Sequence, residues 1–331
     1  MSIHEHDPAR IDPCLRLYNN RSEEKAQLIR SDGTVVHQWA HAQGRSWHYA
    51  EMIEDGHLIA IDKNHSIVEL DRDSNLVWKF ETPSHHDLAR RSNGNTYVLS
   101  GRDRIDANML PDRELYYDCC YEVTPAGDIA WSWFAEDHAA ELGIDTPLPG
   151  DYGFGDWPHV NTCEILPDSP TAARDERFRA GNLLMCGRII HTIWVVDRDT
   201  GAVVWHWGPG ELIGPHMPTM LPNGNILIYD NGNLRGPARG YSRIVELEPL
   251  SGEVVWQYVA DPPDAFYSPS RGSAERLPNG NHLIAESDSG RLFEVAPDGT
   301  VVWELRNDMK RADGRPDPIY RVKAYPPNAL G

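Results

Sequence analysis

The sequence lacks the features of membrane proteins and of nucleic-acid-binding proteins. No stretch of its 331 residues approaches the run of roughly 18 apolar residues that a helix needs to cross a bilayer. The first 14 residues contain no apolar segment typical of a secretory signal. Basic residues are few, since 31 Lys and Arg stand against 50 Asp and Glu and give a net charge of −19. Nucleic acid and anionic membranes attract basic surfaces, so we expect neither as a partner.

Cysteine is also scarce, and the common nucleotide and hydrolase motifs are missing. The five cysteines form no C-x-x-C pair, and they are Cys14, Cys119, Cys120, Cys163 and Cys186. An odd number in a chain of this length disfavours a disulfide scaffold or a zinc ribbon. No P-loop, no G-x-G-x-x-G that opens a helix and no G-x-S-x-G occurs. We therefore expect a cytoplasmic protein with free thiols, and neither a nucleotide-binding fold nor an α/β-hydrolase.

What the sequence does contain is a repeat of short strands. A turn, an apolar pair and a Trp recur in copies that end at Trp78, Trp131, Trp205, Trp256 and Trp303, and a sixth copy ends at His37. Upstream of most copies, a turn that ends in Gly precedes an apolar strand, as at Asn223-Gly224-Asn225. Asn-Gly between apolar runs is a strong hairpin signal. Helical patterns are weak throughout, so the repeat predicts an all-β fold.

Units of four short strands and about 40 to 50 residues are typical of propeller blades. We count six blades, the last formed by residues 15–39 together with an inner strand at 319–324, so that N- and C-terminal strands close the ring. We expect one domain over residues 1–331, with an N-terminal tail at 1–14. Insertions at 102–120, 136–157 and 168–179 are expected over one mouth of the channel. The five repeat Trp should be buried between blades.

Histidines recur at one level of this predicted channel. Counting back eight residues from the Gly of three of the turns leads to His48, His86 and His216. The third blade has its insertion in that interval, but its inner strand carries His159. Innermost strands line the channel of a propeller, so the four imidazoles are expected to converge on its axis. Burying four polar rings together costs stability without a compensating role, which predicts a functional site.

Two chemistries use such a cluster. One His can attack a substrate as a nucleophile while the others bind an anion. Alternatively, the cluster can bind one divalent transition metal (Fe, Mn or Zn) in a lyase or oxygenase, with the ligands His48, His86, His159 and His216.

Arginines and aromatic residues accompany the histidines. Arg188 and Arg243 suit sulfate, phosphate or carboxylate through bidentate hydrogen bonds, whereas Arg271 is interpreted as a surface ion pair. Trp47, Trp157 and either Tyr116 or Tyr117 could stack on an aromatic substrate.

Several stretches resemble the bacterial arylsulfotransferase family, six-bladed propellers that move a sulfuryl group between phenols. They include His85-His86-Asp87-Leu88, Asp156-Trp157-Pro158-His159-Val160-Asn161 and Gly214-Pro215-His216-Met217-Pro218, and the resemblance covers roughly residues 26–306. It implies that His216 is sulfated as a covalent intermediate. It also implies that His86, His159 and Arg188 bind the sulfate and act as acid or base. His216 is followed by Met-Pro where the family pattern has an acidic residue and Pro.

We therefore predict an arylsulfotransferase-like enzyme that acts on a small aromatic substrate without a cofactor, with the metal-dependent enzyme as the alternative. The predicted catalytic residues are His216, His86, His159 and Arg188. The predicted substrate-binding residues are His48, Trp47, Trp157, Asn161, His191, Tyr116 and Arg243. A homo-oligomer is compatible with the sequence.

Overall fold

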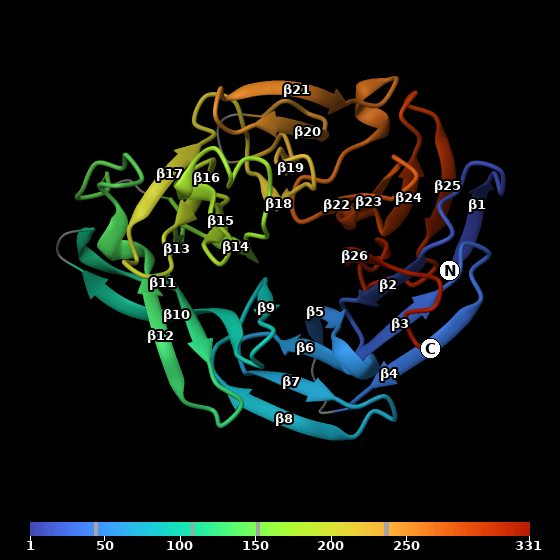
Figure 1. Cartoon of the computed structure of the whole chain (residues 1–331), viewed down its shortest axis with the longest axis horizontal. Coiled ribbons are helices and arrows are strands. Elements are labelled where there is room, and N and C mark those ends of the chain that lie inside the picture. Colours follow the sequence, from blue (N-terminus) through green and yellow to red (C-terminus); the bar gives the residue numbers. More distant parts are fainter. Residues whose placement is uncertain (43–45, 107–108, 150–152, 235–237) are drawn as a thin grey trace.

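Six β-sheets form a closed ring around a central channel (Figure 1). The structure, a computed structural model, describes residues 1–42, 46–106, 109–149, 153–234 and 238–331. The predicted all-β, six-bladed propeller is confirmed. Within these residues no helix is long and apolar enough to span a bilayer. The helical segments are short 3₁₀ turns, namely η1 (Glu54–Gly56), η2 (Ala135–His138), η3 (Glu176–Phe178), η4 (Pro263–Ala265) and η5 (Ser287–Ser289).

Each blade contains four antiparallel strands, which follow one another from the channel outward. Blade 1 contains β5 (Trp47–Met52), β6 (Leu58–Asp62), β7 (Ser66–Leu70) and β8 (Leu76–Glu81). Blade 2 contains β9 (Leu88–Arg90), β10 (Thr96–Asp106), β11 (Leu110–Val123) and β12 (Ile129–Phe134), and the short β13 (Asp156–Trp157) pairs with β11. Blade 3 contains β14 (Val160–Ile165), β15 (Leu183–Gly187), β16 (Thr192–Val196) and β17 (Val203–Trp207).

The remaining blades follow the same order. Blade 4 contains β18 (His216–Met220), β19 (Ile226–Asp230), β20 (Arg243–Glu248) and β21 (Glu253–Tyr258). Blade 5 contains β22 (Ser273–Arg276), β23 (His282–Glu286), β24 (Arg291–Val295) and β25 (Val301–Arg306). Blade 6 contains β26 (Ile319–Tyr325), β2 (Leu15–Asn20), β3 (Lys25–Ile29) and β4 (Val35–Ala40).

The apolar content of each strand depends on its position between the channel and the outer edge of the blade. The middle strands β6, β15 and β19 are buried at every residue, because both of their faces pack against neighbouring blades. The sequences of these three strands are therefore nearly continuous apolar runs. The outer strand β8 is largely exposed. Apolar contacts between adjacent blades thus supply the core.

The two ends of the chain close the ring together. Strand β26 is the innermost strand of blade 6 and pairs with β2, with Tyr18 opposite Val322, as predicted from the sequence. The N-terminal segment also contributes a strand, because β1 (Ser2–His6) adds to the outer edge of blade 5 by pairing with β25. This strand corrects the expectation that residues 1–14 form a tail, which arose because Ser2–His6 carries no repeat signal.

Burial of the repeat Trp residues differs from the expectation. Trp303 is fully buried and Trp205 is 9% exposed, whereas Trp78, Trp131 and Trp256 are only partly buried. These residues lie on the fourth strand of each blade, counted from the channel, so their burial depends on a segment that covers this strand. Strand β1 pairs with β25 and places His6 opposite Trp303. Phe178 from the 168–179 insertion packs edge-on against Trp205, with the ring centroids 5.1 Å apart.

This difference predicts unequal costs of truncation. Trp303→Ala should destabilise the protein by about 3–5 kcal/mol, because a fully buried indole leaves a cavity and loses the hydrogen bond from Nε1 to the Ser31 carbonyl. Trp256→Ala should cost clearly less, since that ring stacks on His282 but stays partly exposed. Urea unfolding of both variants measures the two costs, and equal losses would contradict this account of blade burial.

The insertions lie at two different mouths. Residues 102–120 belong mostly to the β10–β11 hairpin and residues 136–157 lead into β13, and both contribute residues to the mouth where the inner strands begin. Residues 168–179 follow the end of β14 instead. Thr171 there donates a hydrogen bond to the carbonyl of Gly224 in the β18–β19 turn, at the opposite mouth. Positions 107–108 and 150–152 lie outside the described residues.

Adjacent inner strands are joined by side chain to backbone hydrogen bonds. Asp87 accepts from the Cys163 N–H at 2.9 Å, and Thr162 Oγ1 accepts from the Met217 N–H at 3.0 Å. These bonds link blades 2, 3 and 4 in sequence. They fix the height of each inner strand relative to the next, and therefore the level at which the predicted histidines meet.

Candidate active site

The channel-facing ends of the inner strands depart from regular strand geometry. His86, His159 and Arg271 have positive φ values of 54°, 63° and 61° just before β9, β14 and β22, and the β5–β6 register shifts around His48. Non-glycine residues in this backbone region are strained and persist only where surrounding structure holds them, which occurs often at functional sites. These irregularities aim side chains at the channel instead of along the sheet.

A cavity of about 640 Å³ occupies this mouth, and all four predicted histidines line it. Its other lining residues are Arg21, Lys63, Asn64, His85, Tyr116, Asp118, Gly155, Asp156, Arg188, Ser270 and Arg271. Rings of neighbouring blades are close, with centroids 4.7 Å apart for His48 and His86 and 4.8 Å apart for His86 and His159. A cavity of this size accommodates a small organic ligand.

Five of the predicted site residues lie elsewhere. Trp47 and Trp157 are buried in apolar clusters between blades, so neither ring is available to a substrate. Asn161 is buried and donates to the Pro215 carbonyl at 2.8 Å, and His191 Nδ1 accepts from the Gly214 N–H at 3.0 Å. Both therefore hold the turn before His216. Arg243 pairs with Asp230 behind the cavity.

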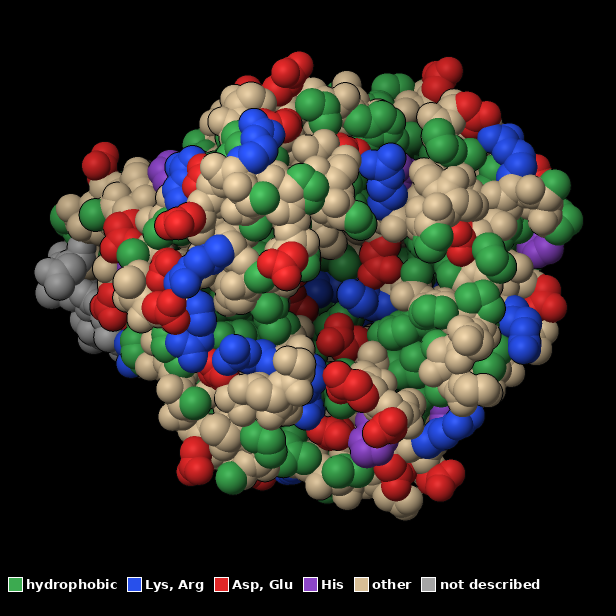
Figure 2. Space-filling model, viewed as in Figure 1, with side chains coloured by type: hydrophobic (Ala, Val, Ile, Leu, Met, Phe, Trp, Pro, Cys, Tyr) green, Lys and Arg blue, Asp and Glu red, His purple; other side chains and the backbone are tan. Residues whose placement is uncertain are grey.

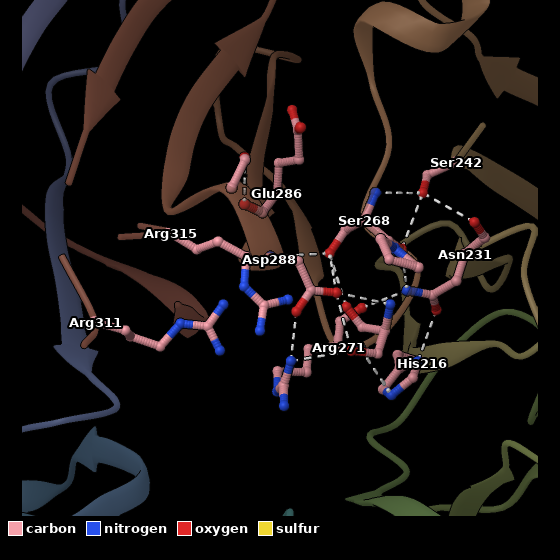
Figure 3. Close-up of polar contacts among 12 residues, drawn as sticks. His216, Asn231, Ser242, Ser268, Arg271, Glu286, Asp288, Arg311 and Arg315 are labelled. Carbon is pink, nitrogen blue, oxygen red and sulfur yellow. Dashed lines mark hydrogen bonds and ion pairs between the residues drawn. The ribbon is translucent and has the colours of Figure 1, made fainter. Parts of the chain in front are cut away.

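Hydrogen bonds fix the tautomer of His216. Its Nδ1 lies 2.6 Å from Asn231 Oδ1 and 3.2 Å from the Gly214 carbonyl, and both of these oxygens only accept (Figure 3). The Asn231 amide cannot be reversed, because its Nδ2 donates to the carbonyls of Ser268 and Arg271. Nδ1 of His216 must therefore carry the proton. Its Nε2 therefore keeps the lone pair, which accepts a hydrogen bond from the Arg271 backbone N–H at 3.3 Å.

Burial keeps His216 neutral. The pKa of its imidazole is held well below 6.5, first by burial and then by the nearby Arg188 guanidinium. A neutral imidazole with a defined lone pair on Nε2 can act as a nucleophile at neutral pH.

Each neighbouring histidine is held by a hydrogen bond at Nδ1, and two of these contacts lead to carboxylates. His159 Nδ1 bonds to Asp156, which leaves Nε2 for the cavity. His86 Nδ1 is 2.8 Å from His85 Nδ1, and His85 Nε2 lies 3.2 Å from an Asp118 carboxylate oxygen. His48 Nδ1 accepts from the His86 N–H at 3.1 Å. His159 in particular can accept and return a proton while Asp156 stabilises its charged form.

The cavity is cationic although the protein is strongly acidic. Arg21, Lys63, Arg188 and Arg271 line it, against two carboxylates that each face a histidine. Burial lowers the pKa of Arg188, Arg21 and Lys63, and mutual repulsion lowers it further. Such a surface favours anions.

Several of these groups are missing from the sequence-based prediction. Lys63 lies in the β6–β7 turn and Arg21 directly follows β2, and the repeat places both chain segments at the mouth where inner strands begin. The direction of β2 and β6 in the repeat could have predicted that Arg21 and Lys63 lie at this mouth. Arg271 does pair with an acid, Asp288, but it also lines the cavity.

The arrangement gives no ready-made metal centre. Across the described ranges, no group of three or more His, Cys, Asp or Glu side chains is placed to hold a metal ion. The Nδ1 of His48 accepts from the His86 N–H, so the neutral His48 ring carries its proton on Nε2 and offers no lone pair to the cavity.

A second cavity of about 310 Å³ lies where the inner strands end. Figure 2 shows the ring as a solid face hollowed at its centre, with Lys and Arg beside Asp and Glu around the hollow. The charged side chains that line this second cavity form ion pairs or hydrogen bonds within the protein. Burial raises the pKa of Glu164 to about 7, and this carboxyl group accepts from the Met220 N–H at 2.9 Å.

Solved structures resemble the chain in fold alone. A protein of unknown function from Bacteroides caccae matches with a TM-score of 0.60 and 15% identity, over 95% of this chain and 99% of that one. A streptogramin B lyase matches with a TM-score of 0.52 and 11% identity, over 98% of both chains. A catalytically inactive virginiamycin B lyase from Staphylococcus aureus, solved with quinupristin, matches with a TM-score of 0.51 and 11% identity. The match covers 93% of this chain and 89% of that one. No curated protein sequence matches the chain.

The family comparison is more specific. Residues 49–308 match the Arylsulfotransferase (ASST) family, which is most of the chain and includes blades 1 to 5 except the first two residues of β5. The match contains His86, His159, Arg188 and His216. With its six-bladed ring and His-lined channel, this protein belongs to the arylsulfotransferase family.

Proposed function

We propose that the protein transfers a sulfuryl group from an aryl sulfate to a phenol through a sulfated His216. The observation that carries this proposal is the Asn231 hydrogen bond, which leaves the lone pair of neutral His216 on Nε2, beside a cationic cavity. Family membership supports sulfotransferase-like activity in general terms.

The first half-reaction forms one bond and breaks one. The Nε2 lone pair of His216 gives up its hydrogen bond from the Arg271 N–H and attacks sulfur. An N–S bond forms, and the S–O bond to the aromatic group breaks with its electron pair leaving on the phenolate oxygen. Arg188 neutralises the sulfonate oxygens as charge redistributes in the transition state. The imidazolium of His159, stabilised by Asp156, protonates the departing phenolate through Nε2.

The second half-reaction reverses these roles. His159, now neutral, takes the proton of the acceptor phenol, and the phenol oxygen attacks sulfur. The N–S bond breaks and its electron pair returns to Nε2 of His216. Tyr116, which borders the cavity, lies within reach of the aromatic ring of either substrate.

Initial-rate kinetics test this order of events. With 4-nitrophenyl sulfate as donor and phenol as acceptor, double-reciprocal plots at several acceptor concentrations should give parallel lines, because the donor product leaves before the acceptor binds. Intersecting lines would contradict a covalent intermediate.

Asn231 should act as a positioning residue in this reaction. Asn231→Leu removes the acceptor that fixes the His216 tautomer and should lower kcat by roughly 10²-fold or more, with KM changed much less. Asn231→Asp should raise the pKa of His216 by stabilising its imidazolium, so the acidic limb of the kcat/KM profile moves to higher pH. The two pH–rate profiles check this role, and a profile for Asn231→Asp that coincides with wild type would contradict it.

A further inference from the structure

Two cations in the active-site cavity have no use in the transfer reaction. Arg21 and Lys63 both line the cavity and are partly buried. Within the described part of the chain, neither side chain forms an ion pair or a hydrogen bond. The carboxylates that attract them from a distance are Asp317 and Asp288 for Arg21 and Asp156 for Lys63. Arg271, in contrast, is neutralised by Asp288. Holding two unpaired cations close together in a cavity costs free energy unless a ligand compensates their charge.

Their place in the ring separates them from the reacting centre. Arg21 follows β2 in blade 6 and Lys63 follows β6 in blade 1. Arg188 follows β15 in blade 3, and His216 begins β18 in blade 4. Blades three apart in a six-bladed ring lie opposite each other (Figure 1). Arg21 and Lys63 thus lie across the channel from Arg188 and His216.

The space between these two pairs suits one small ligand. The cavity of about 640 Å³ is in the range of pockets that bury drug-sized molecules. A planar Arg fork beside a Lys point charge suits a carboxylate, whose two oxygens match the fork. A ligand with a sulfate at one end and a carboxylate at the other would satisfy both cationic pairs at once.

We propose that the substrates are aryl sulfates that also carry a carboxylate, bound by Arg21 and Lys63 across the channel from His216. This inference deepens the proposed sulfuryl transfer and rests on it. An anionic substituent would orient the aromatic ring and direct the sulfate toward Arg188. An aryl sulfate without a carboxylate would bind with only its sulfate end held.

Calorimetric titration with unreactive sulfonates tests the site without any turnover. Benzenesulfonate carries one anionic group, and the meta and para isomers of sulfobenzoate carry two. Wild type should bind at least one sulfobenzoate about tenfold more tightly than benzenesulfonate, the effect of one added charge-assisted contact. Lys63→Gln and Arg21→Gln should each remove most of this preference and leave the affinity for benzenesulfonate within about twofold, a change too small to count as a lost contact.

A matched control comes from the outer strand of the same blade. Lys79→Gln makes the same charge change at an exposed residue that pairs with Glu81, and it should keep the full preference. Equal wild-type affinity for benzenesulfonate and both sulfobenzoates would overturn the inference, as would a preference that survives both cavity variants. A preference lost in those variants, together with no sulfated His216, would leave the anion site standing and contradict the proposed transfer instead.

Discussion

Replacing His216 with Asn is expected to abolish sulfuryl transfer, with kcat falling by about 10⁴-fold or more, as loss of a covalent nucleophile does. Asn is polar and smaller than His, so it fits the site and keeps a donor near Asn231, but it offers no ring nitrogen to attack sulfur. Titration of His216 should add no limb to the pH–rate profile near neutrality, because the pKa of His216 lies well below 6.5 and the attacking form is already neutral there. Turnover of 4-nitrophenyl sulfate with phenol measures the effect.

Two other His→Asn variants serve as controls. His206→Asn changes an exposed residue of β17 and should keep wild-type activity. His48→Asn should have a small effect, because an Asn oxygen can still accept from the His86 N–H. Equal losses in His48→Asn and His216→Asn would contradict the nucleophile and favour the metal-dependent alternative, in which both residues are ligands.

Asp87→Ala is expected to cost about 3–5 kcal/mol of stability, because it leaves the buried guanidinium of Arg321 without a counter-charge. Asp87 accepts from Arg321 Nη1 at 2.6 Å, and Arg321 also donates to the Asn161 carbonyl at 2.7 Å. This network joins blades 6, 2 and 3 across the channel. The double variant Asp87→Leu, Arg321→Met should recover much of the loss, since replacing a whole buried ion pair by apolar groups is often nearly neutral.

Guanidinium unfolding measures these differences. Lys79→Ala removes an exposed ion pair with Glu81 and should change stability by less than about 0.5 kcal/mol. A free energy of unfolding for Asp87→Ala within about 1 kcal/mol of wild type would mean that water already screens the Arg321 charge, contrary to a buried network.

The repeat determined most of what could be predicted of the fold. A turn that ends in Gly and an outer-strand Trp recur in blades 1 to 5, so the blade count and the closure by residues 319–324 followed from periodicity. Strand β1 could not be predicted, because Ser2–His6 belongs to no repeat and pairs only with an edge that the fold exposes. The burial of each Trp likewise depends on segments distant in sequence, such as β1 over Trp303.

Only the site residues at equivalent positions of the repeat could be predicted from the sequence. His48, His86 and His216 occupy equivalent positions, so periodicity placed them in one cavity. Asn161 and His191 carry suitable chemistry but face the turn that supports His216, and side-chain direction at a strained turn is not encoded in spacing. Arg21 and Lys63 follow strands whose direction was known, but no motif marks them.

The most direct test of the central claim is to trap the covalent intermediate. Wild-type protein is mixed with an aryl sulfate in the absence of an acceptor phenol and quenched rapidly at high pH. The mass of the intact protein is then measured by mass spectrometry. The account predicts the added mass of one SO₃ group, mapped to His216 by peptide analysis and absent in His216→Asn. An unmodified wild-type protein under conditions where donor is consumed, or a sulfuryl group mapped to another residue, would contradict it.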